Sequence, residues 1–232
     1  MFFSLSLPYQ YVYITGCAIL AVFWFLIYLA RKDLRREMLW ASFVGAPFGM
    51  IDYFLVPGYW NPESLFGLIK KYGVGIESFL FLFLMAGLVS VIYEFLAGRR
   101  TKKMKRSRKL HLAPLLAGII CFSALTFLFP SKAIYNFMAA GVVSALAVIW
   151  LRRDLLKQAA ASALIFSLFY FAGLFLVNQI FTGMVQNFYN LKNTWGILVL
   201  GIPLEEPLVA FFVGAFWSTS YEFIKSYNER RL

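Results

Sequence analysis

The stretch GIPLEEPLVAFFVGAFWSTSYEF, residues 201–223, places two adjacent glutamates, Glu205 and Glu206, between two prolines in an apolar run. It aligns without a gap with residues 73–95, GVGIESFLFLFLMAGLVSVIYEF, and 8 of the 23 aligned pairs are identical. The identical pairs include Glu77 with Glu205 and the whole Tyr-Glu-Phe ending. An internal match of this kind indicates a fold built from repeated units.

The composition indicates an integral membrane protein. Of the 232 residues, 61% are hydrophobic, 19% are aromatic and only 14% are charged. A bilayer core requires about 20 predominantly apolar residues per helix. Seven stretches meet this requirement, namely residues 9–30, 38–56, 74–97, 113–130, 133–151, 159–182 and 196–224. We therefore predict an all-α membrane protein with seven transmembrane helices, the first of which is too long and aromatic for a cleaved signal.

The basic residues gather in one set of loops. These loops, residues 31–36, 99–109, 152–157 and the C-terminal tail, hold 18 of the 22 lysines and arginines. By the positive-inside rule we expect the N-terminus outside and the C-terminus in the cytoplasm, in the cell membrane. The net charge of +11 then reflects topology and attraction to anionic lipid, at about 1 kcal/mol per residue. We expect no nucleic-acid binding.

A second internal match lies upstream of the first. LARKDL, residues 29–34, resembles WLRRDL, residues 150–155. Three helices reverse the direction of a chain, so two such units with basic loops on the same side need a linker helix between them. We predict parallel 3+1+3 repeats, with a three-helix unit in 1–97, a basic loop and linker helix in 98–132, and a second unit in 133–232. Such proteins place their sites at the repeat interface.

Four acidic residues, Asp52, Glu77, Glu205 and Glu206, fall within apolar stretches. A charged carboxylate at the bilayer centre costs roughly 2.5–3.5 kcal/mol on insertion scales. Since no intramembrane lysine or arginine is available as a partner, a neutral, protonated carboxyl is the natural solution. In an apolar cavity such a group is a proton donor.

A structural role is the alternative for these acids. Pro203 and Pro207 lack an N–H and disturb the helix, so the neighbouring carboxyls could cap the backbone groups freed at the break. Against this reading, Glu77 has Gly75 and Phe79 where the prolines stand.

Helical spacing indicates what the acids face. It puts Leu208 and Phe212 on the face of Glu205, and Phe81 on that of Glu77. Both acids should therefore face apolar and aromatic walls. Their apparent depths differ, because Glu77 lies about one turn inside its stretch while Glu205 lies deeper.

The other polar candidates indicate structural roles. Cys17 and Cys121 fall within apolar stretches and His111 lies beside a basic loop, so neither a disulfide framework nor a metal cluster is expected. Solvated or snorkelling ion pairs are expected for the remaining acids, Asp33, Glu37, Glu63, Glu94, Asp154, Glu222 and Glu229.

These features together resemble the integral-membrane lycopene cyclase domain family. The resemblance is carried by PLEE with the following FF in 203–212, by the weaker GIES copy from residue 75, and by the IDYF and GYWNPE segments in 51–63. Family members occur as two small three-span chains or as fused tandem copies, and this chain is similar to the fused form over nearly its whole length. The resemblance implies cyclisation of the linear end groups of a carotenoid such as lycopene to ionone rings.

The resemblance also implies site residues. The catalytic acid/base candidates are Glu205, Glu206 and Glu77, and the substrate-binding candidates are Asp52, Trp60, Asn178, Phe212, Leu208 and Phe81. The chain departs from the family pattern at Gly75, which replaces the motif proline, and at Ser78, which replaces the second acid. The second unit has no acid matching Asp52, only Asn178 nearby. Either one asymmetric site does the work, or the chain acts on another isoprenoid or has lost activity.

The chemistry of ring closure suits these residues. A carboxylic acid protonates a terminal double bond, aromatic faces stabilise the passing cation, and a carboxylate or water takes a proton back. This is an intramolecular lyase or isomerase reaction with no net redox change. No Gly-rich dinucleotide fingerprint and no His/Cys metal set occur in the sequence, so we expect no cofactor and no metal. The substrate, a carotenoid or other long isoprenoid, would arrive from the bilayer.

Three other classes of protein share parts of this pattern. A catalytically inactive carotenoid- or lipid-binding homologue would keep the fold and lose the reaction. A 3+1+3 small-solute transporter should carry a Pro-Gln pair in the first span of each unit, and the sequence has none. A retinal-binding protein needs a lysine in its last span, and none precedes Lys225 there.

Overall fold

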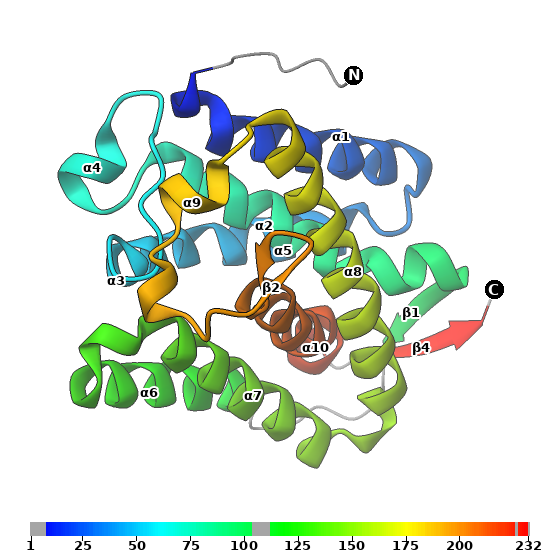
Figure 1. Ribbon diagram of the computed structural model, residues 1–232. Helices are drawn as coiled ribbons and strands as arrows, with labels where there is room; N and C mark the ends of the chain where they lie inside the picture. The colour runs from blue at the N-terminus through cyan, green and yellow to red at the C-terminus, as the bar shows by residue number, and fades with distance from the viewer. Residues whose placement is uncertain (1–7, 104–111, 226, 232) are drawn as a thin grey trace.

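The long apolar runs of the sequence form helices, and short elements connect them at both ends (Figure 1). The computed structural model describes residues 8–103, 112–225 and 227–231, so His111 lies outside the described residues. The long helices are α1 (Val12–Ala30), α2 (Arg35–Gly45), α5 (Ile76–Ala97), α6 (Ala113–Leu128), α7 (Ala133–Leu151), α8 (Leu156–Ile180) and α10 (Glu205–Lys225). The short helices are α3 (Asp52–Leu55), α4 (Leu68–Tyr72) and α9 (Met184–Phe188), with 3-10 turns η1 (Tyr9–Tyr11), η2 (Ala46–Ile51), η3 (Pro130–Lys132), η4 (Arg153–Leu155) and η5 (Leu191–Asn193).

The helices are those of an all-α membrane protein. Five helical stretches among the described residues are long and apolar enough to cross a membrane: Tyr9–Ala30, Arg35–Leu55, Ile76–Ala97, Pro130–Leu151 and Arg153–Ile180. Helix α6 is apolar but shorter, at 16 residues, and α10 has 21 residues. The count of seven spans in a 3+1+3 arrangement stays a prediction.

The second apolar stretch changes its helical form along its length. Pro47 follows the end of α2, and the chain continues as the 3-10 turn η2 and then α3. Within η2, a Cβ added to Gly49 would lie 2.8 Å from the backbone of Phe79 and Ser78 in α5. Only glycine allows this approach of two backbones, and it brings Asp52 close to the start of α5.

Helices α5 and α10 lie against each other at the centre of the molecule (Figure 1). Helix α5 packs against α1 and α2, while α10 packs against α7 and α8, and α6 packs on α7. These two central helices hold the segments that match in sequence. The same packing pattern in both halves agrees with a division into repeats, which remains a prediction for the boundaries 1–97, 98–132 and 133–232.

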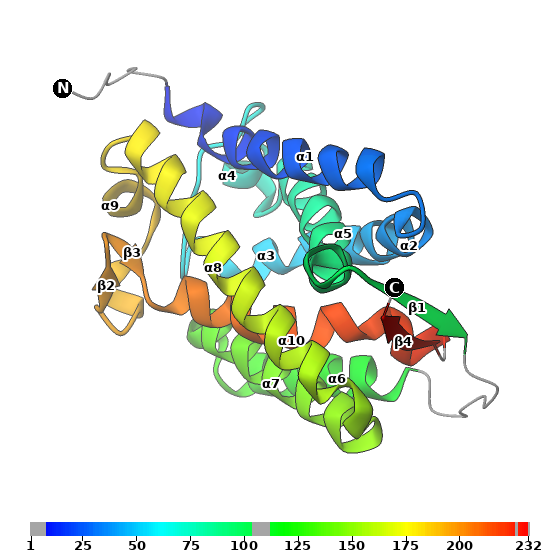
Figure 2. The same cartoon turned by 90° about the vertical axis from the view of Figure 1, so that its right-hand side faces the viewer.

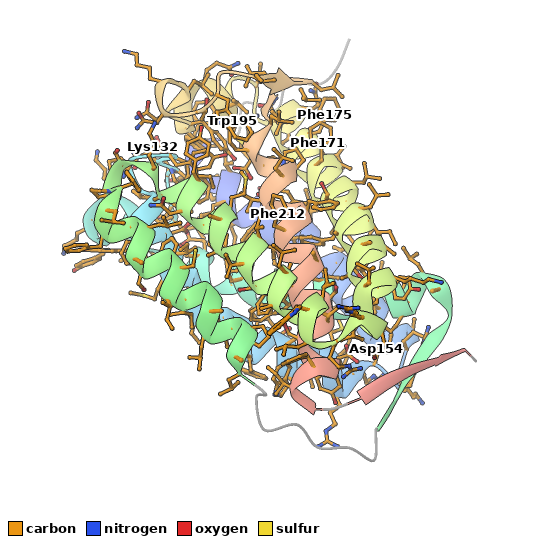
Figure 3. All side chains as sticks on the ribbon, turned by 90° about the horizontal axis from the view of Figure 1, so that it is seen from below. Lys132, Asp154, Phe171, Phe175, Trp195 and Phe212 are labelled. Carbon is orange, nitrogen blue, oxygen red and sulfur yellow. The ribbon has the colours of Figure 1, made fainter. Side chains whose placement is uncertain are left out.

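The two ends of the molecule differ in charge. At one end, strand β1 (Arg99–Lys103) pairs antiparallel with β4 (Tyr227–Arg231), and Arg31–Asp33 and Arg152–Asp154 form ion pairs of 2.9 and 2.5 Å. We call this the basic end. The opposite end holds α4, α9 and the hairpin of β2 (Leu198–Val199) and β3 (Ile202–Pro203) (Figure 2). Lys132 and Trp195 lie at this second end, far from Asp154 (Figure 3).

At this second end, the loops that follow α3 and α9 are joined to each other. Trp60 and Tyr189 form an antiparallel bridge. The Asn61 N–H donates to the Phe188 carbonyl at 2.7 Å, and the Asn190 N–H donates to the Tyr59 carbonyl at 2.8 Å. The two halves of the chain therefore meet here through backbone hydrogen bonds, which hold three aromatic side chains in fixed positions.

Two expectations about the glutamates were wrong. The last helix does not begin near residue 196, because residues 198–203 form the hairpin, with positive φ at Leu200 and Gly201. Glu77 and Glu205 therefore lie in the first turns of their helices, and the expected difference in depth disappears. In addition, Glu37 and Glu94 are buried instead of solvated, since α2, α8 and α10 all pack against α5.

Labelling tests the predicted orientation in the membrane. In a background with Cys17 and Cys121 changed to alanine, we expect Glu63→Cys to react with an impermeant thiol reagent added outside cells. Arg153→Cys should react only after permeabilisation, because the basic end should face the cytoplasm. Both side chains are exposed, so access through the protein does not limit either reaction. The reverse labelling pattern would contradict the predicted topology.

Candidate active site

A large apolar cavity lies beside the central helices. Its volume is about 390 Å³, and residues of α1, α3, α5, α6, α7, α8, α9 and α10 line it. Nearly all of the lining side chains are aliphatic or aromatic. The acidic residues that line it, among those described, are Asp52 and Glu206. A mostly apolar cavity with a few convergent polar groups is typical of a small-molecule site.

Glu206 is held by tyrosine hydroxyls from both halves of the chain. Tyr59 Oη donates to Glu206 Oε1 at 2.7 Å, and Tyr170 Oη donates to Glu206 Oε2 at 2.6 Å. The hydroxyl of Tyr189 also lies beside this carboxyl. Short hydrogen bonds to both oxygens stabilise a carboxylate and fix its orientation. The arrangement therefore fixes the orientation of the Glu206 side chain and stabilises its carboxylate form.

Two of these tyrosines, Tyr59 and Tyr189, lie in the loops outside the predicted spans. Burial, followed by the charge of Glu206, raises the pKa of both phenols well above their usual range. They therefore stay protonated at neutral pH and remain hydrogen-bond donors.

Asp52 is the second acid of the cavity. Tyr13 Oη donates to Asp52 Oδ2 at 2.9 Å, and Ser78 and Trp60 also lie near its carboxyl. Glu206 is close enough to act on Asp52 electrostatically. The first half of the chain thus supplies one carboxyl of the cavity and the second half supplies the other.

Aromatic rings surround the two acids. The Tyr13 ring lies edge-on to Trp60 at 5.0 Å and to Phe81 at 5.6 Å between centroids. Phe81 in turn lies 6.4 Å from Tyr170, and Tyr59 lies 5.4 Å from Tyr189. Such π faces attract cations within about 6 Å. The site can therefore stabilise a positive charge on an apolar substrate that has no polar group of its own.

Glu77 and Glu205 make different contacts from Glu206. Glu77 Oε1 accepts the backbone N–H of Leu65 at 2.7 Å, and Glu205 Oε1 accepts that of Trp195 at 2.6 Å. Tyr135 Oη also donates to Glu205 Oε1 at 3.0 Å. Each glutamate thus anchors the loop that precedes its helix. This agrees with the structural alternative, in which the carboxyls satisfy backbone groups at a helix start.

Ser78 and Glu206 occupy equivalent positions in the two halves, and the residue three positions before each of them differs. This difference explains why Glu206 is free to face the cavity. In the first half, Ser78 Oγ accepts the Gly75 N–H at 3.1 Å, as in a capping box. A Cβ at Gly75 would lie 2.7 Å from Glu77 Oε2, so a larger residue there would require the Glu77 side chain to shift. In the second half, Pro203 has no N–H to be capped, and the Glu206 carboxyl turns to the tyrosines instead.

The cavity includes some of the predicted site residues and leaves out others. Asp52, Trp60, Phe81 and Glu206 line it, whereas Glu77, Glu205, Asn178, Leu208 and Phe212 do not. Adjacent residues of an α-helix point about 100° apart, so the wall of the cavity along α10 follows the face of Glu206. Phe212 packs against Gly141 of α7, and Asn178 lies against Gly201 of the hairpin; Figure 3 shows Phe212 part-way along the bundle.

Sequence reasoning missed the tyrosines of the site, Tyr13, Tyr59, Tyr170 and Tyr189. One signal was available, because a tyrosine within an apolar stretch needs a partner for its hydroxyl. Tyr13 and Tyr170 fall in such stretches, but the sequence does not say which carboxyl each one reaches. Among the described residues, no group of three or more His, Cys, Asp or Glu is placed to hold a metal ion.

The fold and the site define a class, an all-helical membrane protein with buried carboxyls facing an apolar cavity. The family model described as Lycopene cyclase matches residues 10–96 and 132–224. The chain therefore belongs to the lycopene cyclase family, which supports a carotenoid or related isoprenoid as substrate. No curated protein and no solved structure matches the chain.

A substitution at Pro203 tests why Glu206 faces the cavity. Pro203→Ser creates the capping-box pattern Ser-x-x-Glu and supplies an N–H that competes for the Glu206 carboxyl. In the hairpin register, residue 203 is opposite Leu198, next to the turn pair of Val199 and Ile202, so this N–H points away from β2. Such a cap is worth about 1 kcal/mol, so we expect cyclase activity to fall about fivefold.

The melting temperature distinguishes this effect from misfolding. Pro203→Ser should leave it unchanged or raise it slightly, because a cap is gained. Wild-type activity in the folded variant would show that the N–H of residue 203 does not compete with the tyrosines for the Glu206 carboxyl.

Proposed function

We propose that the chain is an acid/base cyclase that closes the linear end groups of a lycopene-type carotenoid into ionone rings within the membrane. The observation that carries the proposal is the Glu206 carboxyl, held by two tyrosines where an apolar cavity meets a second acid, Asp52. Membership of the lycopene cyclase family supports the substrate class.

The proton of Glu206 starts the proposed reaction. It adds to the terminal double bond of the substrate and leaves a tertiary cation. The neighbouring double bond attacks this cation, forms the new carbon–carbon bond and moves the positive charge into the ring. Tyr59 and Tyr170 stabilise the Glu206 carboxylate that remains, through their hydrogen bonds to both of its oxygens.

Loss of a proton from the ring completes the reaction. Asp52 is the proposed acceptor, because its carboxyl lines the same cavity as Glu206 and lies close to Trp60 and Tyr13. One proton enters and one leaves, so the product is an isomer of the substrate and no electron carrier is required. The aromatic rings around the acids stabilise the cation between these two steps.

The proposed site is single and asymmetric. Glu206 has Ser78 as its counterpart in the first half, and Ser78 is engaged in capping Gly75. Glu77 and Glu205, the other acid/base candidates from the sequence, anchor loops. We assign proton donation to Glu206 and structural roles to the other two glutamates.

The proposed setting is the cell membrane. The basic end would face the cytoplasm and contact anionic lipid, and the acids would lie in the half nearer the outer surface. The substrate would come from the bilayer and need not enter water.

Expression in a lycopene-accumulating host tests the proposal. We expect wild-type protein to produce ring-containing carotenoids, detected by chromatography and absorption. Glu206→Gln should lower the rate by about 10²- to 10⁴-fold, the usual contribution of a general acid. The amide keeps the size and polarity of the side chain but cannot deliver a proton. Asp52→Asn should lower the rate as well, if Asp52 accepts the proton.

Glu205→Gln is the matched control. Its amide oxygen can still accept the Trp195 N–H, so we expect most of the activity to remain. Greater loss in Glu205→Gln than in Glu206→Gln would contradict the assignment. A wild-type protein that binds lycopene and leaves it linear would instead indicate a carotenoid-binding homologue without activity.

A further inference from the structure

The cavity is shorter than the substrate class requires, an argument that rests on the proposed function. Along α10 it runs from Glu206 to Trp217, a distance of about 16 Å at the α-helical rise of about 1.5 Å per residue. An extended carotenoid has a length comparable to a bilayer core, about 30 Å. With one end group at Glu206, the rest of the molecule must leave the cavity.

The cavity reaches the surface between α1 and α8. Most of its lining residues are buried or half-buried, but Phe23 on α1 and Leu176 on α8 are 43% and 53% exposed, and Ile119 on α6 is 43% exposed. Ala172 on α8 also lines the cavity and is exposed. Figure 2 shows these two helices near each other on the side of the hairpin and diverging toward the basic end, with α5 visible between them.

The opening between α1 and α8 has defined edges. Towards the end that holds α9 and the hairpin, Tyr9 Oη donates to the Thr182 carbonyl at 2.7 Å. Towards the basic end, the rings of Phe23 and Phe169 meet edge to face at 5.0 Å. Between these contacts lie two cavity-lining glycines, Gly16 on α1 and Gly173 on α8, and a Cβ added to either would meet no atom within 4 Å.

The corresponding position in the other half is covered by α6. There α3 lies beside α7, and α6 packs over them and adds Leu115, Ile119 and Phe122 to the cavity wall. Phe122 contacts Phe54 of α3 at 5.4 Å and Phe137 of α7 at 6.3 Å. A Cβ at Gly118 of α6 would lie 2.1 Å from Ser144 of α7.

We infer that the gap between α1 and α8, at Gly16 and Gly173, is the lateral entrance through which the substrate's hydrocarbon chain passes from the bilayer, and that α6 closes the equivalent gap in the other half. Gly173 also stands where the first half has Asp52, in the register of the RKDL and RRDL match. One half thus supplies an acid at this position, and the other supplies space for the chain.

A graded series at Gly173 tests the entrance. Gly173→Ala, Gly173→Val and Gly173→Phe should slow the uptake of a linear carotenoid from vesicles in the order of side-chain size. We expect Gly173→Phe to lower the uptake rate by about tenfold or more, within the range over which mutations change association rates. Absorption of the bound polyene follows uptake, and Gly16→Leu should act in the same direction.

Matched controls lie on the same helices. Ala18→Leu on α1 and Leu168→Phe on α8 change exposed side chains that do not line the cavity, and they should leave uptake unchanged. Cyclisation of a truncated isoprenoid that fits wholly inside the cavity should be less affected by Gly173→Phe than cyclisation of the full-length substrate. Melting temperatures identify any variant that fails to fold. If Gly173→Phe does not fold, Gly173→Val is compared with wild type instead.

The outcomes separate this inference from the proposed function. Wild-type uptake rates in folded Gly173→Val and Gly173→Phe would overturn the entrance. Wild-type protein that takes up carotenoid without cyclising it would overturn the proposed function, while the Gly173 series would still test the entrance. Absence of both uptake and cyclisation in wild type would overturn both.

Discussion

The hydrogen bonds of Tyr59 and Tyr170 to Glu206 set the main constraint on this structure. They join a loop of the first half to two helices of the second, and they place a carboxyl in apolar surroundings, where an unsatisfied polar group would be costly. Other features serve this contact. The Trp60–Tyr189 bridge holds the loop that carries Tyr59, and Pro203 withholds the N–H that would draw Glu206 away. The cavity therefore contains an acidic side chain, Glu206, that is buried from water.

The two halves show how similar helix starts acquire different roles. Glu77 and Glu205 accept equivalent backbone N–H groups, and these anchors fix the loops on which the site depends. One residue further on, Ser78 caps its own helix while Glu206 faces the cavity. Gly49 adds a second asymmetry, because its close approach to α5 brings Asp52 to the same place from the other half. Unequal contributions from the halves thus bring two acids, Asp52 and Glu206, to one cavity.

The sequence predicted the membrane class, the family and the region of the site, because composition, charge and internal matching are properties of the chain itself. It placed Asp52, Trp60, Phe81 and Glu206 among the candidates, and all four line the cavity. It did not separate Glu205 from Glu206, because adjacent residues of a helix differ only in the direction in which they point. The start of α10 could not be located either, because the hairpin before it is as apolar as the helix. The tyrosine partners depend on contacts between residues as far apart as 59 and 206, which no local pattern specifies.

The central claim is that the Glu206 carboxyl delivers the proton that closes the ring, and the isotope content of the product tests it most directly. With purified protein in lipid and heavy water, the exchangeable carboxyl carries deuterium, so the account predicts a single added deuterium in each ring formed. Glu206→Gln should abolish this incorporation, while Glu205→Gln should retain it. Ring formation in heavy water without added deuterium, or undiminished incorporation in Glu206→Gln, would contradict the claim.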